Sequence, residues 1–130
     1  MIDAFTVHTQ AHEQLIDITR EVAEAVWRSG TKDGVALVFV PHTTAAVTIN
    51  ENADPDVVHD ILLALREAVP DRKGFRHAEG NSVAHVKTSL VGSSVQALVE
   101  DGRLVLGTWQ SIFFCEFDGP RARKVQVRVA

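Results

Sequence analysis

The chain has 130 residues, of which 45% are hydrophobic and 23% are charged, a balance typical of one folded globular domain and not of a disordered chain. Thirteen basic residues against seventeen acidic ones give a formal charge of −4, which excludes the broad positive surface that a nucleic-acid-binding protein needs. The single cysteine, Cys115, excludes an internal disulfide and a cysteine-cluster metal site.

The amino-terminal sequence shows no targeting signal. Residues 1–5 lack the basic and then apolar pattern of a signal peptide, and no apolar run approaches the roughly 18 residues of a membrane span. Together with the lone cysteine, these features predict a cytoplasmic protein with no membrane partner. No repeat or linker divides the sequence, so we expect residues 1–130 to form one domain.

The first half of the chain predicts strands and helices with clear boundaries. An extended stretch over 5–8 is followed by a helix that Asp17 caps and Gly30 ends. The continuous apolar run over 35–40 predicts a strand buried on both faces, and Pro41 ends it. A second strand follows over 45–49, and a second helix begins at Asp54–Pro55 and runs as an apolar stripe up to Pro70.

The second half is richer in strands. Residues 71–80 are polar and predict a loop, and 82–90 fit either a helix or a strand, of which we favour the helix. Four strands are then expected over 95–99, 104–106, 110–117 and 123–129, with turns at Asp101–Gly102 and Gly119–Pro120. Many strands with two or three helices predict an α+β domain.

Six histidines stand out in a chain that has no tyrosine. His42 follows a predicted strand, His77 lies in the predicted loop, and His85 lies in the stretch that follows it. Three neutral imidazoles and a water would form an open zinc-type site, but hydrogen-bonded structural histidines explain the same spacing. The other three, His8, His12 and His59, are explained as solvated or partly packed side chains.

Several other side chains are candidates for chemistry. Glu51 and Asp54 lie near His42 in sequence and can act as acid, base or ligand, although helix capping alone explains Asp54. Basic side chains suited to phosphate are Lys87, Arg121 and Arg123. The sequence has no P-loop, dinucleotide-binding fingerprint or serine nucleophile elbow.

Two further side chains have competing interpretations. The segment that contains Trp109 and Gln110 can form a pocket wall, whereas periodicity favours core packing for Trp109. Cys115 lies in an apolar strand pattern and is expected to be packed and not nucleophilic.

Five linked motifs, in this order, resemble those of the YjbQ-like proteins, which are also described as secondary thiamine-phosphate synthases. The motifs are Pro41-His42-Thr43-Thr44-Ala45, Asn50-Glu51-Asn52-Ala53-Asp54-Pro55, His77-Ala78-Glu79-Gly80-Asn81-Ser82 with Ala84-His85-Val86-Lys87, Gly107-Thr108-Trp109-Gln110, and Glu116-Phe117-Asp118-Gly119-Pro120-Arg121. The resemblance spans nearly the whole chain. It implies a compact α+β fold with a β-sandwich-like core, assembled as a homotrimer with clefts near the subunit boundaries.

The resemblance also implies a site and a reaction. His42, His77 and His85 would bind a divalent metal, with zinc expected and magnesium an option for a diphosphate substrate. The reaction would join an aminopyrimidine methyl diphosphate to a thiazole phosphate and release diphosphate. Expected substrate-binding side chains are Thr43, Thr44, Asn81, Lys87, Trp109, Gln110 and Arg121, and the expected catalytic carboxylates are Glu51 and Asp54.

Two alternatives remain open from the sequence. The same metal site can support phosphate-ester hydrolysis, with Glu51 as the base for a metal-bound water. A trimeric protein that binds a phosphorylated metabolite or a metal without turnover fits the same residues.

Overall fold

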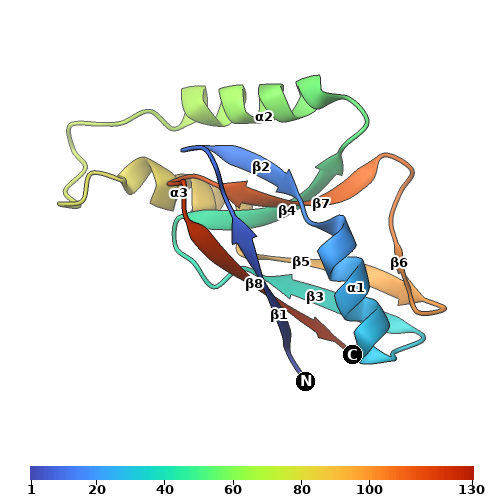
Figure 1. The fold of residues 1–130 in the computed structure, drawn as a ribbon. Coiled ribbons are helices and arrows are strands. Elements are labelled where there is room, and N and C mark those ends of the chain that lie inside the picture. Colours follow the sequence, from blue (N-terminus) through green and yellow to red (C-terminus); the bar gives the residue numbers. More distant parts are fainter.

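The computed structural model describes residues 1–130 and contains eight strands and three helices (Figure 1). In chain order they are β1 (Asp3–His8), β2 (Gln14–Asp17), α1 (Thr19–Ser29), β3 (Gly34–Phe39), β4 (Ala45–Glu51), α2 (Pro55–Ala68), α3 (Ser82–Val91), β5 (Ser94–Glu100), β6 (Arg103–Val105), β7 (Gln110–Glu116) and β8 (Ala122–Val129). The α+β class predicted from the sequence is confirmed.

The strands form two antiparallel sheets. Sheet A has the order β1-β8-β3-β5-β6, and sheet B has the order β2-β7-β4. The main core lies between them, where Val38 and Val125 of sheet A meet Val47 and Phe114 of sheet B, and Val22 of α1 joins the same cluster. Burial of these side chains is the main force that holds the two sheets together, at ~25 cal/mol for each Å² of apolar surface removed from water.

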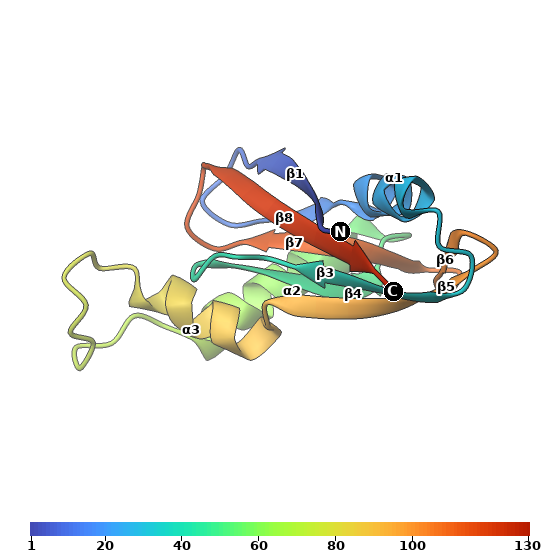
Figure 2. The same cartoon turned by 90° about the horizontal axis from the view of Figure 1, so that it is seen from below.

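Helices α2 and α3 cover the other face of sheet B (Figures 1 and 2). A second cluster joins Ala46 and Cys115 of sheet B to Ala84 of α3, and Leu65 of α2 packs against it. No residue of α2 is fully buried, and its apolar stripe is half-buried: Val57, Val58, Ile61, Leu62 and Leu65. None of the three helices combines the length and apolarity that a membrane crossing requires.

The outer face of sheet A has no covering element (Figure 2). This corrects the prediction that β3 is buried on both faces: Ala36 and Val38 point inward, whereas Leu37 and Phe39 point outward and are 37% and 40% exposed. On the neighbouring strands, Leu98 is 63% exposed and Val105 is 46% exposed. The apolar run in β3 therefore leaves a hydrophobic surface on the single chain.

The local signals for helix boundaries work largely as expected. The Asp54 carboxylate accepts a hydrogen bond from the Asp56 amide at 2.9 Å, and Pro55 is the first residue of α2. The prediction that Asp17 caps α1 is wrong by one residue: the N-cap is Ile18, which makes no side-chain capping bond, and Asp17 just before it accepts hydrogen bonds from the amide and hydroxyl of Thr19. Gly30 ends α1 as expected, with a φ of 70°. The sequence missed one element, β2, whose four residues are too few for a periodic pattern.

The connection between β7 and β8 packs tightly against the segment after β1. A β-carbon at Gly119 would lie 2.5 Å from the Ala11 carbonyl oxygen and 2.8 Å from both Glu116 Cγ and Thr9 Oγ1. Only glycine fits there without displacing backbone. This close approach holds the residues around Gly119 in place at one end of sheet B.

We expect Gly119→Ala to lower the free energy of unfolding by about 1–3 kcal/mol, the usual cost of overpacking. Urea unfolding measures this change. The control is Gly74→Ala, because a β-carbon at Gly74 meets nothing within 4 Å. Equal stability of the two variants would contradict the tight packing described for this turn.

Candidate functional site

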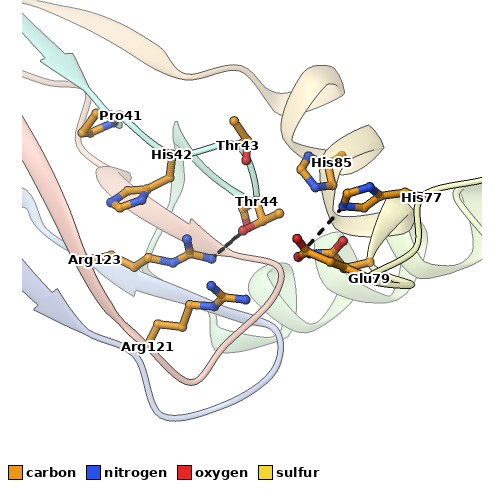
Figure 3. A pocket seen from close by; sticks show the side chains of 10 residues that line it. Pro41, His42, Thr43, Thr44, His77, Glu79, His85, Arg121 and Arg123 are labelled. Atoms are coloured by element: carbon orange, nitrogen blue, oxygen red, sulfur yellow. Dashed lines mark hydrogen bonds and ion pairs between the residues drawn. The ribbon is translucent and has the colours of Figure 1, made fainter.

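A polar cavity of about 410 Å³ lies where three connecting segments meet (Figure 3). The loop between β3 and β4, the start of β8 with the turn before it, and the segment from the end of the α2–α3 loop into α3 supply its walls. We call it the histidine–arginine cavity, and its lining residues are Pro41, His42, Thr43, Thr44, His77, Glu79, Asn81, His85, Arg121 and Arg123. All of them except Pro41 carry polar side chains, so the cavity suits a charged or strongly hydrogen-bonding ligand.

Arg123 is held in the wall of this cavity by a buried ion pair. Its Nε and Nη2 atoms donate to the two carboxylate oxygens of Glu116, at 2.9 and 2.5 Å, and Nη2 also donates to Thr44 Oγ1 at 2.8 Å. The Arg123 side chain is 4% exposed and that of Glu116 is 0% exposed. Such a bidentate contact fixes the plane of the guanidinium group.

The Glu116 carboxylate is kept charged by its partners. Burial by itself would raise the pKa of Glu116, but hydrogen bonds from Arg123, the Asp118 amide and Thr9 outweigh burial and hold the pKa below its ordinary value. Removing one partner of a buried pair typically costs about 3–5 kcal/mol, because the other charge is left without compensation. The pair is therefore a structural requirement of the cavity wall.

One edge of Arg123 remains available for a ligand. Its Nη1 atom makes no hydrogen bond within the chain, and it is not among the buried polar atoms that lack a partner. It therefore reaches the open space of the cavity. Arg121 has the same arrangement: Nε and Nη2 are held by Asp118, at 2.8 and 2.7 Å, and Nη1 has no acceptor.

His42 is held as a neutral imidazole. Its Nε2 atom accepts a hydrogen bond from the Lys124 amide at 2.8 Å, so the ring proton lies on Nδ1. Burial lowers the pKa of His42 below its ordinary value of 6.5, and the positive charge of Arg123 lowers it further. The Lys124 contact also occupies the nitrogen that would otherwise be free to coordinate a metal.

His77 and His85 face each other on the opposite wall of the cavity (Figure 3). Their ring centroids lie 5.3 Å apart in an edge-to-face arrangement, and His77 Nε2 is 4.0 Å from a carboxylate oxygen of Glu79. These three side chains are the groups on this wall that can donate or accept a proton.

The three predicted metal ligands line one cavity but do not form a metal-binding group. No set of three or more His, Cys, Asp or Glu side chains in the chain is arranged to hold a metal ion. The arrangement of donors in the single chain therefore does not fit a zinc ion held by His42, His77 and His85. Zinc and magnesium binding stay predictions.

Other predicted site residues lie far from this cavity. Glu51 pairs with Gln110 at one end of the β4–β7 ladder, whereas Ala45 pairs with Glu116 at the other. Six residue steps separate these ends, or about 20 Å of strand. Asp54 and Trp109 belong to the Glu51 end, where the Asn52 amide donates to the Trp109 carbonyl. Within one chain, Glu51, Asp54, Trp109 and Gln110 therefore do not line the histidine–arginine cavity.

Two interpretations of single residues are settled by burial. Trp109 is 62% exposed, so the expectation of core packing for this side chain is wrong. The residue lies in the turn just before β7 and not within a strand. Cys115 is 1% exposed, and burial raises the pKa of its thiol to about 12, which confirms that it is packed and unreactive. Lys87 is buried too, and it lies in a neighbouring cavity and not among the lining residues of this one.

Sequence reasoning did not identify Glu116 as a site residue, although a signal was present. Glu116 is in phase with Ile112 and Phe114 in β7, and Arg123 is in phase with Val125 in β8. Side chains two residues apart share a face of a strand, so both charges fall on the buried side. Opposite charges in two such positions indicate a buried pair.

The structure thus defines a class of protein, a two-sheet α+β domain with an arginine- and histidine-lined cavity at one end of its sheets. The chain belongs to the YjbQ-like family: the family model for UPF0047 protein YjbQ-like matches residues 3–130. This confirms the resemblance noted from the five motifs.

Relatives of known sequence and structure agree with this assignment. The chain is 50% identical over 129 residues to UPF0047 protein MJ1081 of Methanocaldococcus jannaschii, covering 99% of this chain and 94% of that protein. It is 49% identical over 130 residues to UPF0047 protein YugU of Bacillus subtilis, covering 99% and 98%. A crystal structure of an uncharacterised YjbQ/UPF0047 family protein from Clostridium acetobutylicum matches with a TM-score of 0.95 at 55% identity, covering 98% of this chain and 99% of that chain.

The lowered pKa of His42, which its burial and the charge of Arg123 cause, predicts a specific pH dependence of stability. The folded chain keeps His42 neutral below pH 6.5, whereas the unfolded chain takes up its proton near that pH. Stability therefore falls as the pH decreases from about 6.5 towards the lowered pKa. We expect the His42 imidazole to titrate below pH 6.5 in an NMR titration.

The variant His42→Gln serves as the comparison, because its amide oxygen can accept from Lys124 and does not titrate. It should flatten the part of the stability curve below about pH 6.5 that comes from His42. A His42 pKa at or above 6.5, or an unchanged curve in the variant, would contradict the neutral assignment.

Proposed function

We propose that the protein is an enzyme that acts on a phosphorylated small molecule, and that the phosphate or diphosphate group binds between Arg121 and Arg123. One observation carries the proposal: Arg123 is buried and fixed by Glu116 and Thr44, yet its Nη1 edge is free at the cavity. A guanidinium that is already oriented loses little freedom when it binds an anion.

The other lining residues support an anionic ligand. Arg121 adds a second guanidinium with a free Nη1 atom, while Glu79 is the only carboxylate among the lining residues. The hydroxyl of Thr43 and the imidazoles of His77 and His85 add hydrogen-bond donors. Phosphate and diphosphate present several acceptor oxygens, which match such a set of donors.

The specific reaction that we propose is the one that the family resemblance implies. A thiazole phosphate nitrogen attacks the methylene carbon of an aminopyrimidine methyl diphosphate, so that a carbon–nitrogen bond forms and the carbon–oxygen bond to the diphosphate breaks. The diphosphate leaves with the bonding electron pair. Arg121 and Arg123 would stabilise this developing negative charge, because their positions are fixed before the substrate binds.

The remaining residues have supporting roles in this proposal. His77 or His85 would donate a hydrogen bond to the departing diphosphate, and the attacking ring nitrogen has no proton to lose. Magnesium would enter as a companion of the diphosphate substrate. Metal-dependent hydrolysis with Glu51 as the base is less well supported, because Glu51 lies at the other end of β4.

Calorimetry with inorganic diphosphate tests the binding step. We expect Arg121→Gln to weaken binding about tenfold or more, because a charge-assisted hydrogen bond contributes about 1.5–3 kcal/mol. Arg121 is half exposed, so the variant should keep its fold. The matched control is Arg20→Gln, an arginine at the start of α1 that is 88% exposed and lines neither cavity, which should bind as the unchanged chain does.

Turnover is measured with both phosphorylated precursors and detection of thiamine phosphate by chromatography. The proposal predicts product that is reduced in Arg121→Gln and unchanged in Arg20→Gln. Binding without product from these precursors would favour a non-enzymatic metabolite-binding protein. If diphosphate does not bind the unchanged chain at all, the proposal is wrong.

We also propose that the chain assembles as a homotrimer, as the family resemblance implies, and that the outer face of sheet A forms the contact. Val35, Leu98 and Val105 are cross-strand neighbours on this face, and Leu37 and Phe39 extend the apolar surface along β3. A second copy of the chain carries the same surface and can cover it.

We expect the unchanged chain to have three times its 14.2 kDa mass in solution. Introducing a charge with Leu37→Asp should reduce the mass to that of one chain, measured by light scattering after gel filtration. The control Leu63→Asp changes a leucine of similar exposure on α2, 39% against 37%, and should remain a trimer. A trimer in Leu37→Asp would place the contact elsewhere.

A further inference from the structure

A second cavity of about 480 Å³ adjoins the histidine–arginine cavity. The two share Glu79 and Asn81 as wall residues. We call this second space the lysine cavity, because Lys87 of α3 lines it together with Glu13, Arg66, Val83 and Asp118. Nothing in the anion-binding proposal uses it.

Lys87 is the most unusual residue of the lysine cavity. Its side chain is 2% exposed, and its ammonium group donates to the Glu13 carboxylate, which also accepts from Arg66 at 3.1 Å. Glu13 is the only hydrogen-bond partner of Lys87 Nζ, so two N–H bonds of the ammonium group have no acceptor in the chain. Burying a lysine in this way is costly, and an acceptor atom of a ligand would offset part of the cost.

Asn81 supplies a second unfilled position. Its Nδ2 atom donates to Asp118 Oδ2 at 2.8 Å, which fixes the orientation of the amide, because the reverse orientation would set its oxygen against the carboxylate. The Asn81 Oδ1 atom is buried and has no hydrogen-bond partner. A buried acceptor without a partner costs about 1–3 kcal/mol, which a ligand N–H or O–H group would offset.

The charges around the lysine cavity do not favour a second phosphate. Lys87 and Arg66 are both paired with Glu13, and Glu79 and Asp118 add two further carboxylates. The unfilled positions are one acceptor at Asn81 and donors at Lys87. A neutral group that both donates and accepts hydrogen bonds matches them.

We infer that the lysine cavity binds the neutral part of the same phosphorylated ligand. This inference rests on the proposed function. With the phosphate between Arg121 and Arg123, a hydroxyl- or amino-bearing group would extend past Asn81 and Glu79 into the lysine cavity. Both polar atoms are closed to solvent in the chain alone, so the ligand would displace wall side chains as it donates to Asn81 Oδ1 and accepts from Lys87 Nζ. A polyol and an amino-substituted nitrogen heterocycle share this chemistry.

The experiment compares three probes by calorimetry: inorganic phosphate, ribose 5-phosphate for the polyol, and an aminopyrimidine methyl phosphate for the heterocycle. The inference predicts that at least one ester binds the unchanged chain about tenfold more tightly than inorganic phosphate. The ester that binds more tightly than inorganic phosphate identifies the neutral group.

Two variants test whether the gain comes from the lysine cavity. Val83→Phe places a ring in the cavity, and Lys87→Met combined with Glu13→Gln removes the buried charges as a pair, so that neither is left alone. Each should lose the extra affinity for the ester while keeping that for inorganic phosphate. The control Lys73→Met, at an exposed lysine outside both cavities, should change neither.

The outcomes separate the two proposals. If phosphate binds but no ester binds more tightly, or if both variants keep the full gain, the inference is wrong and the anion site stands. If neither inorganic phosphate nor diphosphate binds the unchanged chain, the proposed function fails and the inference fails with it. Thermal unfolding of each variant checks that it is folded. If the double variant is not folded, the Val83→Phe result alone decides the test.

Discussion

The buried pair between Arg123 and Glu116 is the interaction on which the site depends. It joins the last residue of β7 to the second residue of β8, and through Thr44 it also reaches the start of β4. An exposed pair such as Arg20–Glu24 contributes about 0–1 kcal/mol, whereas disrupting a buried one costs several times more. The Arg123 guanidinium that faces the cavity is therefore anchored by the same contact that joins the two sheets at this end.

Most of the fold is predictable from local signals in the sequence. Asp54–Pro55, Gly30 and Pro41 set element boundaries whose physical causes are local, so the helices and most strands lie where the sequence predicts. The stretch over 82–90, whose pattern fits either a helix or a strand, forms the favoured helix, α3. The outward side chains of β3 could not be predicted, because an apolar residue has the same identity whether its own chain or a second copy covers it.

The site is only partly predictable for a different reason. His42, His77 and His85 line one cavity, because each lies in a segment at the same end of the domain, but they do not form the expected set of metal ligands. Glu51 is only nine residues from His42, but β4 runs between them and carries Glu51 away from the cavity. Short separation in sequence therefore misleads where a strand intervenes, and the phase of a charge within a strand is the better guide, as Glu116 shows.

The residues of the two walls of the histidine–arginine cavity belong to different kinds of structural element. Arg121 and Arg123 belong to the turn before β8 and to its start, tied to core strands, whereas His77 and Glu79 lie in the irregular segment between α2 and α3. Substitutions in that segment disturb little packing, since loops tolerate change better than core strands do. The architecture thus permits the arginine wall to persist while the wall that carries His77 and Glu79 changes, so related chains with the same arginines can differ in the shape and chemistry of the rest of the cavity.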